Sequence, residues 1–275
     1  MTGEDRAQGR DVIASPNIWH WPGVYEEENR AQDTRGAVYA ALREAVDWAG
    51  RDVVDVGCGS GFHLPMFART ARSVTGIEPH PPLVALARRR IEHLDTATVT
   101  AGSATDMPLP DASADLIHAR TAYFFGPGCG AGITEAMRVL RPGGALAVID
   151  LDATAHPYGE WMRTDLPHYE PRTVEAFFAA QGFDLRRIDT EWAFPDRDTL
   201  ERVLGIEFAP RVAARAMRET PGTTLTVRYR LHIRRRPHGV ELPQPSASLR
   251  AASVRTANPE DPGELGDLLG LRQLR

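Results

Sequence analysis

Short apolar runs alternate along the chain with segments whose apolar residues recur at helical spacing. Strands are predicted for five runs rich in Val, Ile and Ala, at residues 52–56, 73–78, 97–101, 114–119 and 144–150. Pro81-Pro82 opens a helix predicted over residues 81–94, because proline is tolerated in a first helical turn. Another helix leads into the turn Pro142-Gly143-Gly144, which precedes the last of these strands. This alternation predicts an α/β fold with a doubly wound, mostly parallel sheet.

Both ends of this region carry further elements. Helices are predicted over residues 171–181 and 197–218, and strands over 185–194 and 223–235. Near the start, apolar residues at helical spacing predict a helix over residues 26–48. It follows the segment SPNIWHWPGVY, residues 15–25, which gathers aromatic residues between two prolines.

The composition along the chain predicts one folded domain between two tails. The domain is expected to span residues 15–235. It divides into an N-terminal aromatic strap and helix (15–48), a ligand-binding half (51–152) and a substrate-side half (153–235). Residues 1–14 are polar and are expected to form a flexible leader. Residues 236–275 are rich in Pro, Ser, Ala and Glu and are expected to be a disordered tail.

The most informative segment is VVDVGCGSGF, residues 53–62, where a predicted strand runs into a glycine turn. Glycines at spacing two leave no side chains where a ligand approaches the backbone at the start of the next helix. The next strand ends in Glu78, which can accept hydrogen bonds from both hydroxyls of a ribose. Together these features predict a nucleoside lying across the carboxyl ends of a parallel sheet.

Two other nucleotide motifs are excluded. Phe62 stands where the dinucleotide pattern G-x-G-x-x-G has its third glycine. A phosphate-binding loop of the G-K-S/T kind is impossible, because all 32 basic residues are arginine.

Composition narrows the class of protein further. The net charge of −5 and the pI near 6.0 weigh against a nucleic-acid-binding protein, which usually has a basic excess. The two cysteines, Cys58 and Cys129, form neither a disulfide framework nor a metal-binding spacing, so no metal is expected. The polar start and the lack of a long apolar run predict a cytoplasmic protein with no membrane span.

Four motifs in order carry a resemblance to a known family. They are Asp55-x-Gly57-x-Gly59-x-Gly61, Glu78, the stretch AGSATDMPLPDASAD, and LRPGG. This string resembles the class I S-adenosylmethionine-dependent methyltransferases, most of all the group that includes the ubiquinone and menaquinone C-methyltransferases (methyltransferase type 11). The resemblance covers residues 35–152 well and 153–235 weakly. It implies a seven-stranded Rossmann-like sheet with an antiparallel edge strand.

The resemblance also implies an activity. The cofactor would be S-adenosylmethionine, the product S-adenosylhomocysteine, and the acceptor a small organic molecule methylated at O, N or C. Two alternatives stay open. The protein would either hold the cofactor without catalysis, since fold does not imply function, or methylate an RNA base, which the acidic balance disfavours. The oligomeric state is not predicted.

The resemblance assigns the residues around the cofactor. Asp55 would anchor the methionine amino group directly or through water, although capping the glycine turn is its alternative role. Glu78 would bind the ribose diol, and Ser103 stands where the family often has Asp, which leaves the backbone of Ala104 as the stronger adenine contact. The full set expected to contact the cofactor is Tyr25, Asp55, Gly57, Cys58, Gly59, Gly61, Glu78, Pro79, Ser103, Ala104 and Arg120.

Residues for the chemistry are harder to select, because the methyl donor is already activated and mainly needs alignment. Tyr123 follows the fourth strand and would contact the donor or the acceptor, unless it is an aromatic plug. His156 and His168 follow the fifth strand and are candidate bases, although lone loop histidines more often lie on the surface. The strap residues Trp19, His20, Trp21 and Tyr25 would either close over the donor or pack on the sheet edge.

Two further features have simpler interpretations. His118 lies within a predicted strand and is interpreted as a core histidine. The run RYRLHIRRR, residues 228–236, resembles an RNA-binding patch, but at alternating strand positions it more often marks an edge strand protected by charge.

Overall fold

The computed structural model of the chain describes Val12 and residues 15–238. The rest of the predicted leader, and the predicted tail from residue 239 onward, lie outside the described residues.

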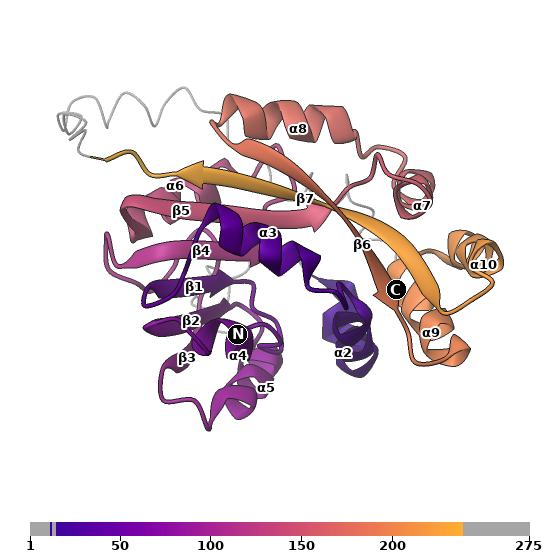
Figure 1. Cartoon of the computed structure of the whole chain (residues 1–275), viewed down its shortest axis with the longest axis horizontal. Helices are drawn as coiled ribbons and strands as arrows, with labels where there is room; N and C mark the ends of the chain where they lie inside the picture. Colours follow the sequence, from indigo (N-terminus) through magenta and orange to yellow (C-terminus); the bar gives the residue numbers. More distant parts are fainter. Residues whose placement is uncertain (1–11, 13–14, 239–275) are drawn as a thin grey trace, which may run out of the picture.

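Within the described residues, seven strands form one sheet in the order β3-β2-β1-β4-β5-β7-β6 (Figure 1). The strands are β1 (Asp52–Val56), β2 (Ser73–Glu78), β3 (Ala97–Ala101), β4 (Ala114–Arg120), β5 (Leu140–Leu151), β6 (Asp184–Ala193) and β7 (Thr224–Arg235). Neighbouring strands from β3 to β5 pair in parallel, whereas β7 runs antiparallel to β5 and β6. The predicted doubly wound, mostly parallel sheet is confirmed.

Strand β5 begins four residues earlier than predicted. Leu140 already pairs with Ala114, and after a register shift Ala145 pairs with Leu116. The Pro-Gly-Gly segment therefore lies inside the strand as an irregularity instead of a turn before it. Gly143 has a φ of +82°, a backbone conformation that glycine adopts without strain.

Ten helices are described in the same part of the chain. They are α1 (Pro16–His20), α2 (Pro22–Ala31), α3 (Ala37–Ala45), α4 (Leu64–Ala68), α5 (Pro81–Ile91), α6 (Gly130–Val139), α7 (Tyr158–Asp165), α8 (Pro171–Ala180), α9 (Arg197–Glu207) and α10 (Pro210–Glu219). The short helix α7 was not predicted, because its segment shows no clear apolar periodicity.

Two predicted long helices are each broken in the structure. The helix predicted over residues 26–48 ends at Ala31, because Asp33 has a φ of +48° and its carboxylate accepts hydrogen bonds from Val38 N–H and the Thr190 hydroxyl. The helix predicted over 197–218 becomes α9 and α10, because Phe208 is extended and Pro210 has no N–H to continue the ladder. In both cases the helical spacing of apolar residues continues past the point where the backbone leaves the helix, so the prediction joined two helices into one.

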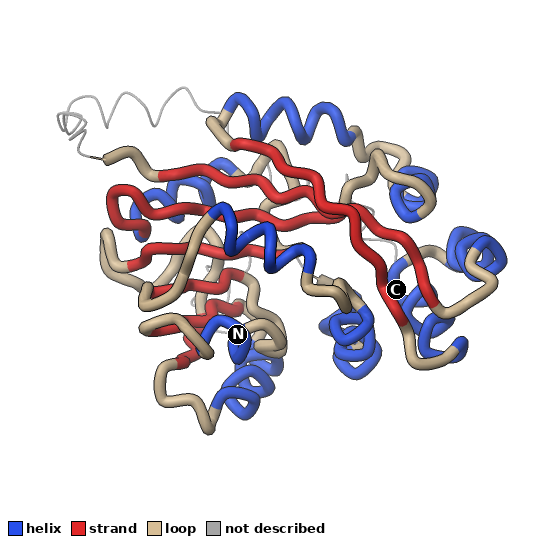
Figure 2. Tube along the Cα trace, viewed as in Figure 1, coloured by secondary structure: helices blue, strands red, loops and turns tan. Residues whose placement is uncertain are grey.

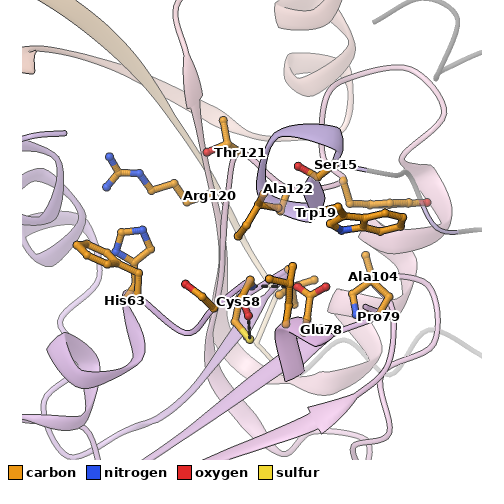
Figure 3. A pocket seen from close by; sticks show the side chains of 18 of the residues that line it. Ser15, Trp19, Cys58, His63, Glu78, Pro79, Ala104, Arg120, Thr121 and Ala122 are labelled. Atoms are coloured by element: carbon orange, nitrogen blue, oxygen red, sulfur yellow. Dashed lines mark hydrogen bonds between the residues drawn. The ribbon is translucent and has the colours of Figure 1, made fainter. Parts of the chain in front are cut away.

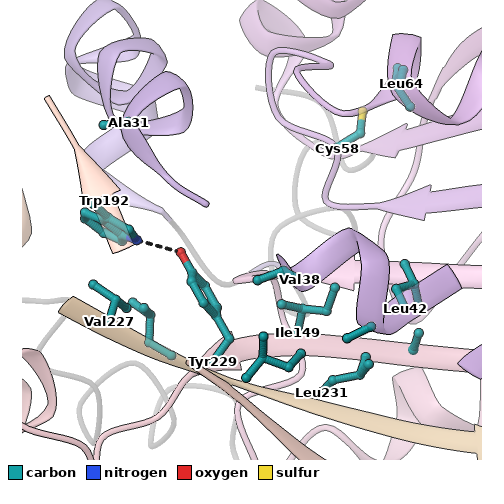
Figure 4. Close-up of a cluster of buried hydrophobic side chains, with 14 of the residues drawn as sticks. Ala31, Val38, Leu42, Cys58, Leu64, Ile149, Trp192, Val227, Tyr229 and Leu231 are labelled. Carbon is teal, nitrogen blue, oxygen red and sulfur yellow. Dashed lines mark hydrogen bonds between the residues drawn. The ribbon is translucent and has the colours of Figure 1, made fainter. Parts of the chain in front are cut away.

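Helices cover both faces of the sheet (Figure 2). Alternate strand residues point to opposite faces. Val53, Leu116 and Ala147 therefore join a core with α3, α4 and α5, whereas Val54 and Ile117 join a second core with α6 and α8. At the wide end of the first core, Trp192 Nε1 donates to the Tyr229 hydroxyl at 2.9 Å (Figure 4).

The arginine-rich strand is not an edge strand, which corrects the sequence interpretation. Strand β7 lies between β5 and β6, and β6 forms the edge. Arg230 is 0% exposed and lies opposite Asp150 in the β5–β7 register, with its Nη2 donating to the Asp150 carboxylate at 2.8 Å and to the Tyr169 hydroxyl at 2.5 Å. This charge is buried and paired instead of protecting a free edge.

Candidate functional site

A cavity of about 160 Å³ opens at the carboxyl ends of β1, β2 and β4 (Figure 3). Its floor is the glycine turn that follows β1. Residues of the loops after β2, β3 and β4 line its sides, and residues of α1 and α2 cover it. This is the place where an open parallel sheet binds ligands.

The glycine turn brings three parts of the chain into close contact. Gly57, Gly59 and Gly61 have φ values of +69°, +57° and +77°, which side chains rarely adopt. A Cβ atom on Gly57 would lie 2.5 Å from Ala122 Cβ, and one on Gly59 would lie 2.7 Å from Ile18 Cδ1. Gly61 does not line the cavity; a Cβ there would meet the backbone of α5. The first two glycines therefore shape the cavity and the third allows helix packing.

Glu78 is held rigidly at the end of β2. It is 4% exposed, its Oε2 accepts from Gly59 N–H at 2.9 Å, and its Oε1 accepts from His80 N–H at 2.9 Å. Burial raises the pKa of Glu78, and the two backbone N–H groups oppose that rise. Each oxygen keeps a free lone pair for a ligand hydroxyl.

The loops after β2 and β3 form one end of the cavity. Pro79, Ser103 and Ala104, three of the residues predicted to contact the cofactor, line it. Above them the Trp19 ring stacks on His80, with ring centroids 4.3 Å apart and planes 10° apart. Of the four strap residues, Trp19 and Tyr25 line the cavity, whereas His20 and Trp21 are exposed.

The opposite end of the cavity is lined by the positively charged side chain of Arg120. Arg120 is 8% exposed, lies over the Tyr229 and Tyr39 rings at 4.9 and 5.6 Å, and donates from Nη2 to Gln32 at 2.8 Å. Its Nε has no hydrogen-bond partner in the part of the chain that the structure describes. Figure 3 shows Arg120 and His63 together, away from Trp19 and Pro79.

His63 was missed by the sequence analysis. It lines the cavity directly after the glycine turn. Burial, with a further contribution from Arg120, lowers the pKa of His63, so its imidazole is neutral at pH 7. A lone histidine at the start of a helix gives no sequence signal, and only the fold brings it to the cavity.

Asp55 lies behind the floor and does not line the cavity. Its Oδ1 is 2.7 Å from His118 Nδ1, and its Oδ2 has no hydrogen-bond partner among the described residues. His118 is 0% exposed, which confirms its interpretation as a core histidine.

Comparison with known proteins now gives this site a family. Residues 54–148 match the family described as methyltransferase domain. This part of the chain is a methyltransferase domain. A probable S-adenosylmethionine-dependent methyltransferase of Mycolicibacterium smegmatis is 35% identical over 134 residues, which cover 46% of this chain and 47% of that protein. A demethylmenaquinone methyltransferase of Tropheryma whipplei is 33% identical over 129 residues, covering 46% of this chain and 53% of that protein.

The match extends to structure. The YcgJ protein of Bacillus subtilis superposes with a TM-score of 0.51 at 16% identity, over 74% of this chain and all of that one, which shows the fold. The chain spans about half the length of the curated relatives it matches. The matched region of the methyltransferase domain contains the glycine turn, Glu78 and Arg120, but not the helices that cover the cavity.

The predicted catalytic residues separate into two groups. Tyr123 lines the cavity, with a φ of +53°. His156 is exposed and pairs with Glu160 at 3.1 Å, and His168 is also exposed; neither lines the cavity. The two histidines are surface groups in this structure, so their surroundings offer no support for a role as base. Tyr25, which is predicted to contact the cofactor, lines the cavity from α2.

Among the described residues, no helix is long and apolar enough to cross a membrane. No group of three or more His, Cys, Asp or Glu side chains in that part of the chain is arranged to hold a metal ion.

Proposed function

We propose that the protein is an S-adenosylmethionine-dependent methyltransferase that moves a methyl group to an oxygen, nitrogen or carbon atom of a small organic acceptor. The observation that carries this proposal is the Glu78 carboxylate, fixed beside the glycine turn with a lone pair of each oxygen free for a ribose diol. The names of the methyltransferase relatives support it. In this proposal residues 51–152 bind the cofactor and residues 153–235 face the acceptor, within one domain of residues 15–235.

The cavity offers a fitting partner for each part of the cofactor. Pro79, Ser103 and Ala104 line the end beneath Trp19, where adenine fits. Arg120, with its unpartnered buried Nε among the described residues, fits the carboxylate of the amino-acid part. Because Asp55 does not line the cavity, its predicted role toward the amino group would be exerted through a water molecule bound to its buried Oδ2.

The cofactor would supply a methyl group on a positively charged sulfur. The residues of the chain would hold the two ends of the cofactor, and the covering helices would exclude water. The cavity-lining rings of Tyr25 and Tyr123 can stabilise a cation through their faces. Alignment and a dry site are what an in-line displacement needs from a protein.

The first test is calorimetric titration of S-adenosylhomocysteine into the full chain, with NAD as the comparison ligand. Binding of S-adenosylhomocysteine without binding of NAD is the expected result. Acceptors would then be screened by following transfer of a labelled methyl group from S-adenosylmethionine. Binding of NAD in preference to S-adenosylhomocysteine would overturn the proposal, and cofactor binding without turnover on any acceptor would favour a non-catalytic binding protein.

Two further expectations belong to this proposal. The protein is expected to act in the cytoplasm, and its acceptor is expected not to be a nucleic acid, because the net charge is −5. Retention of RNA by the purified protein at low salt, lost on adding salt, would contradict the second expectation.

Replacing Arg120 tests which part of the cofactor lies at its end of the cavity. Arg120→Met is expected to weaken binding of S-adenosylhomocysteine about tenfold or more, because a charge-assisted hydrogen bond to the carboxylate contributes ~1.5–3 kcal/mol. Binding of 5′-methylthioadenosine, which lacks the amino-acid part, is expected to stay unchanged. The measurement is calorimetry with both ligands. An equal loss for both ligands would mean that Arg120 supports the fold of the cavity and does not contact the carboxylate.

A further inference from the structure

The helices α1 and α2, residues 16–31, form a roof over the donor cavity. On the cavity side Ile18 contacts the glycine turn, and Glu26 accepts from Arg90 Nη2 at 2.6 Å. On the other side α2 packs along α9 (Figure 1). The roof is thus held between the cofactor-binding half and the substrate-side half.

A carboxyl pair lies at the contact between the roof and α9. Glu207 of α9 accepts from Asn17 Nδ2 in the roof and from the Tyr158 hydroxyl of α7, both at 2.6 Å. The Glu28 carboxyl of the roof lies within hydrogen-bond reach of Glu207. Glu28 is 3% exposed; its Oε1 accepts from Gln32 Nε2 at 2.6 Å, and its Oε2 has no donor among the residues the structure describes.

Two ionised carboxylates in contact away from water repel each other strongly. Burial raises the pKa of Glu28 well above its usual value, and Glu207 raises it further, whereas Gln32 and Arg120 oppose the rise. The groups that face the pair from other elements are Arg120 of β4, Tyr158 of α7 and Tyr229 of β7. Burial raises the pKa of both tyrosines, so they stay neutral at pH 7.

We propose that Glu28 and Glu207 hold one proton between them, and that this protonated pair positions the roof over the donor cavity. The inference rests on the proposed function, because it concerns the affinity for the same cofactor. The link to the cavity is direct: Gln32, which donates to Glu28, accepts from Arg120 in the cavity wall.

The direction of the pH effect follows from the proton. The pair is protonated at low pH, so its contribution is complete there and is lost as pH rises through the raised pKa of Glu28. The two carboxylates then repel, the roof is released and the cofactor dissociates more readily. Protonation of Glu78 would weaken binding at low pH, whereas loss of the shared proton weakens it at high pH. The two effects are therefore separable.

The test is a pH series of S-adenosylhomocysteine titrations on the full chain, from about pH 6 to about pH 9, comparing the wild type with Glu28→Gln. A glutamine mimics the protonated acid permanently. The wild-type affinity is expected to fall about tenfold over this range, as a shift of one pKa unit on binding would give. The variant is expected to keep its low-pH affinity throughout.

A second readout needs no cofactor. The free energy of unfolding in urea is expected to fall with pH in the wild type and to stay flatter in Glu28→Gln. Glu27→Gln is the matched control, because Glu27 forms an exposed ion pair with Arg202 between the same two helices. Its pH profile is expected to match the wild type.

The outcomes separate this inference from the proposed function. If the affinity for S-adenosylhomocysteine and the free energy of unfolding both depend on pH equally in the wild type and in Glu28→Gln, the proposal of a shared proton is overturned. Failure of the wild type to bind S-adenosylhomocysteine at any pH would overturn the proposed function instead, while the unfolding series would still test the pair. Should Glu28→Gln not fold, Glu207→Gln removes the same repulsion and is expected to flatten the same slope.

Discussion

Glu78→Ala is expected to weaken binding of S-adenosylhomocysteine by about a hundredfold or more. In the proposed function Glu78 would accept two charge-assisted hydrogen bonds from the ribose diol, and their loss, ~3 kcal/mol, corresponds to about that factor. It also leaves the N–H groups of Gly59 and His80 without the acceptor that fixes the turn. Calorimetric titration of the wild type and the variant measures the effect.

Two companion variants sharpen this result. Glu78→Gln keeps the size of the side chain but replaces one acceptor oxygen by a donor, so an intermediate loss is expected. Glu92→Ala changes an exposed glutamate at the end of α5 and is expected to bind like the wild type. An affinity of Glu78→Ala close to that of the wild type would show that the nucleoside lies elsewhere. The placement of the cofactor in the cavity would then be wrong as well.

Asp150→Ala is expected to lower the free energy of unfolding by about 3–5 kcal/mol, because it leaves the fully buried Arg230 without its carboxylate partner. Tyr169 still accepts from Arg230, and Glu175 lies 3.8 Å away, but neither replaces the charge directly opposite on β5. Urea unfolding followed by circular dichroism measures the change.

Strand β7, which carries Arg230, also supplies the control for Asp150. Arg228 and Asp189 form an exposed pair between β7 and β6, and Asp189→Ala is expected to cost only ~0–1 kcal/mol. Replacing both members of the buried pair, as Asp150→Leu with Arg230→Met, is expected to restore much of the stability lost in the single variant. Equal losses from Asp150→Ala and Asp189→Ala would contradict the importance given to burial.

The sheet was predictable because its signals are local. Strands β1, β2 and β3 begin and end at the residues that their runs of Val, Ile and Ala predicted. The helices were less predictable, since a break depends on one residue. Asp33 ends α2 because its carboxylate finds partners in α3 and β6, and neither partner is visible in apolar spacing.

The candidate site divides in the same way. The glycine turn, Glu78 and Ala104 follow strand ends, so their position in a doubly wound sheet is fixed once the strands are known. His63 and Glu207 lie at helix ends, and only the packing of α4 and α9 gives them a role. His156 and His168 follow β5 as predicted, but their loops turn them to solvent.

The stacked rings of Trp19 and His80 have a practical consequence for kinetics. The Trp19 indole is half-buried, and release of α1 would expose it further to solvent and shift its fluorescence emission to longer wavelengths. Trp48, Trp161 and Trp192 are buried in the core, whereas Trp21 is 41% exposed. In a Trp21→Phe protein, stopped-flow measurement of tryptophan fluorescence would therefore report the release of α1 as a shift in emission wavelength, without any attached dye.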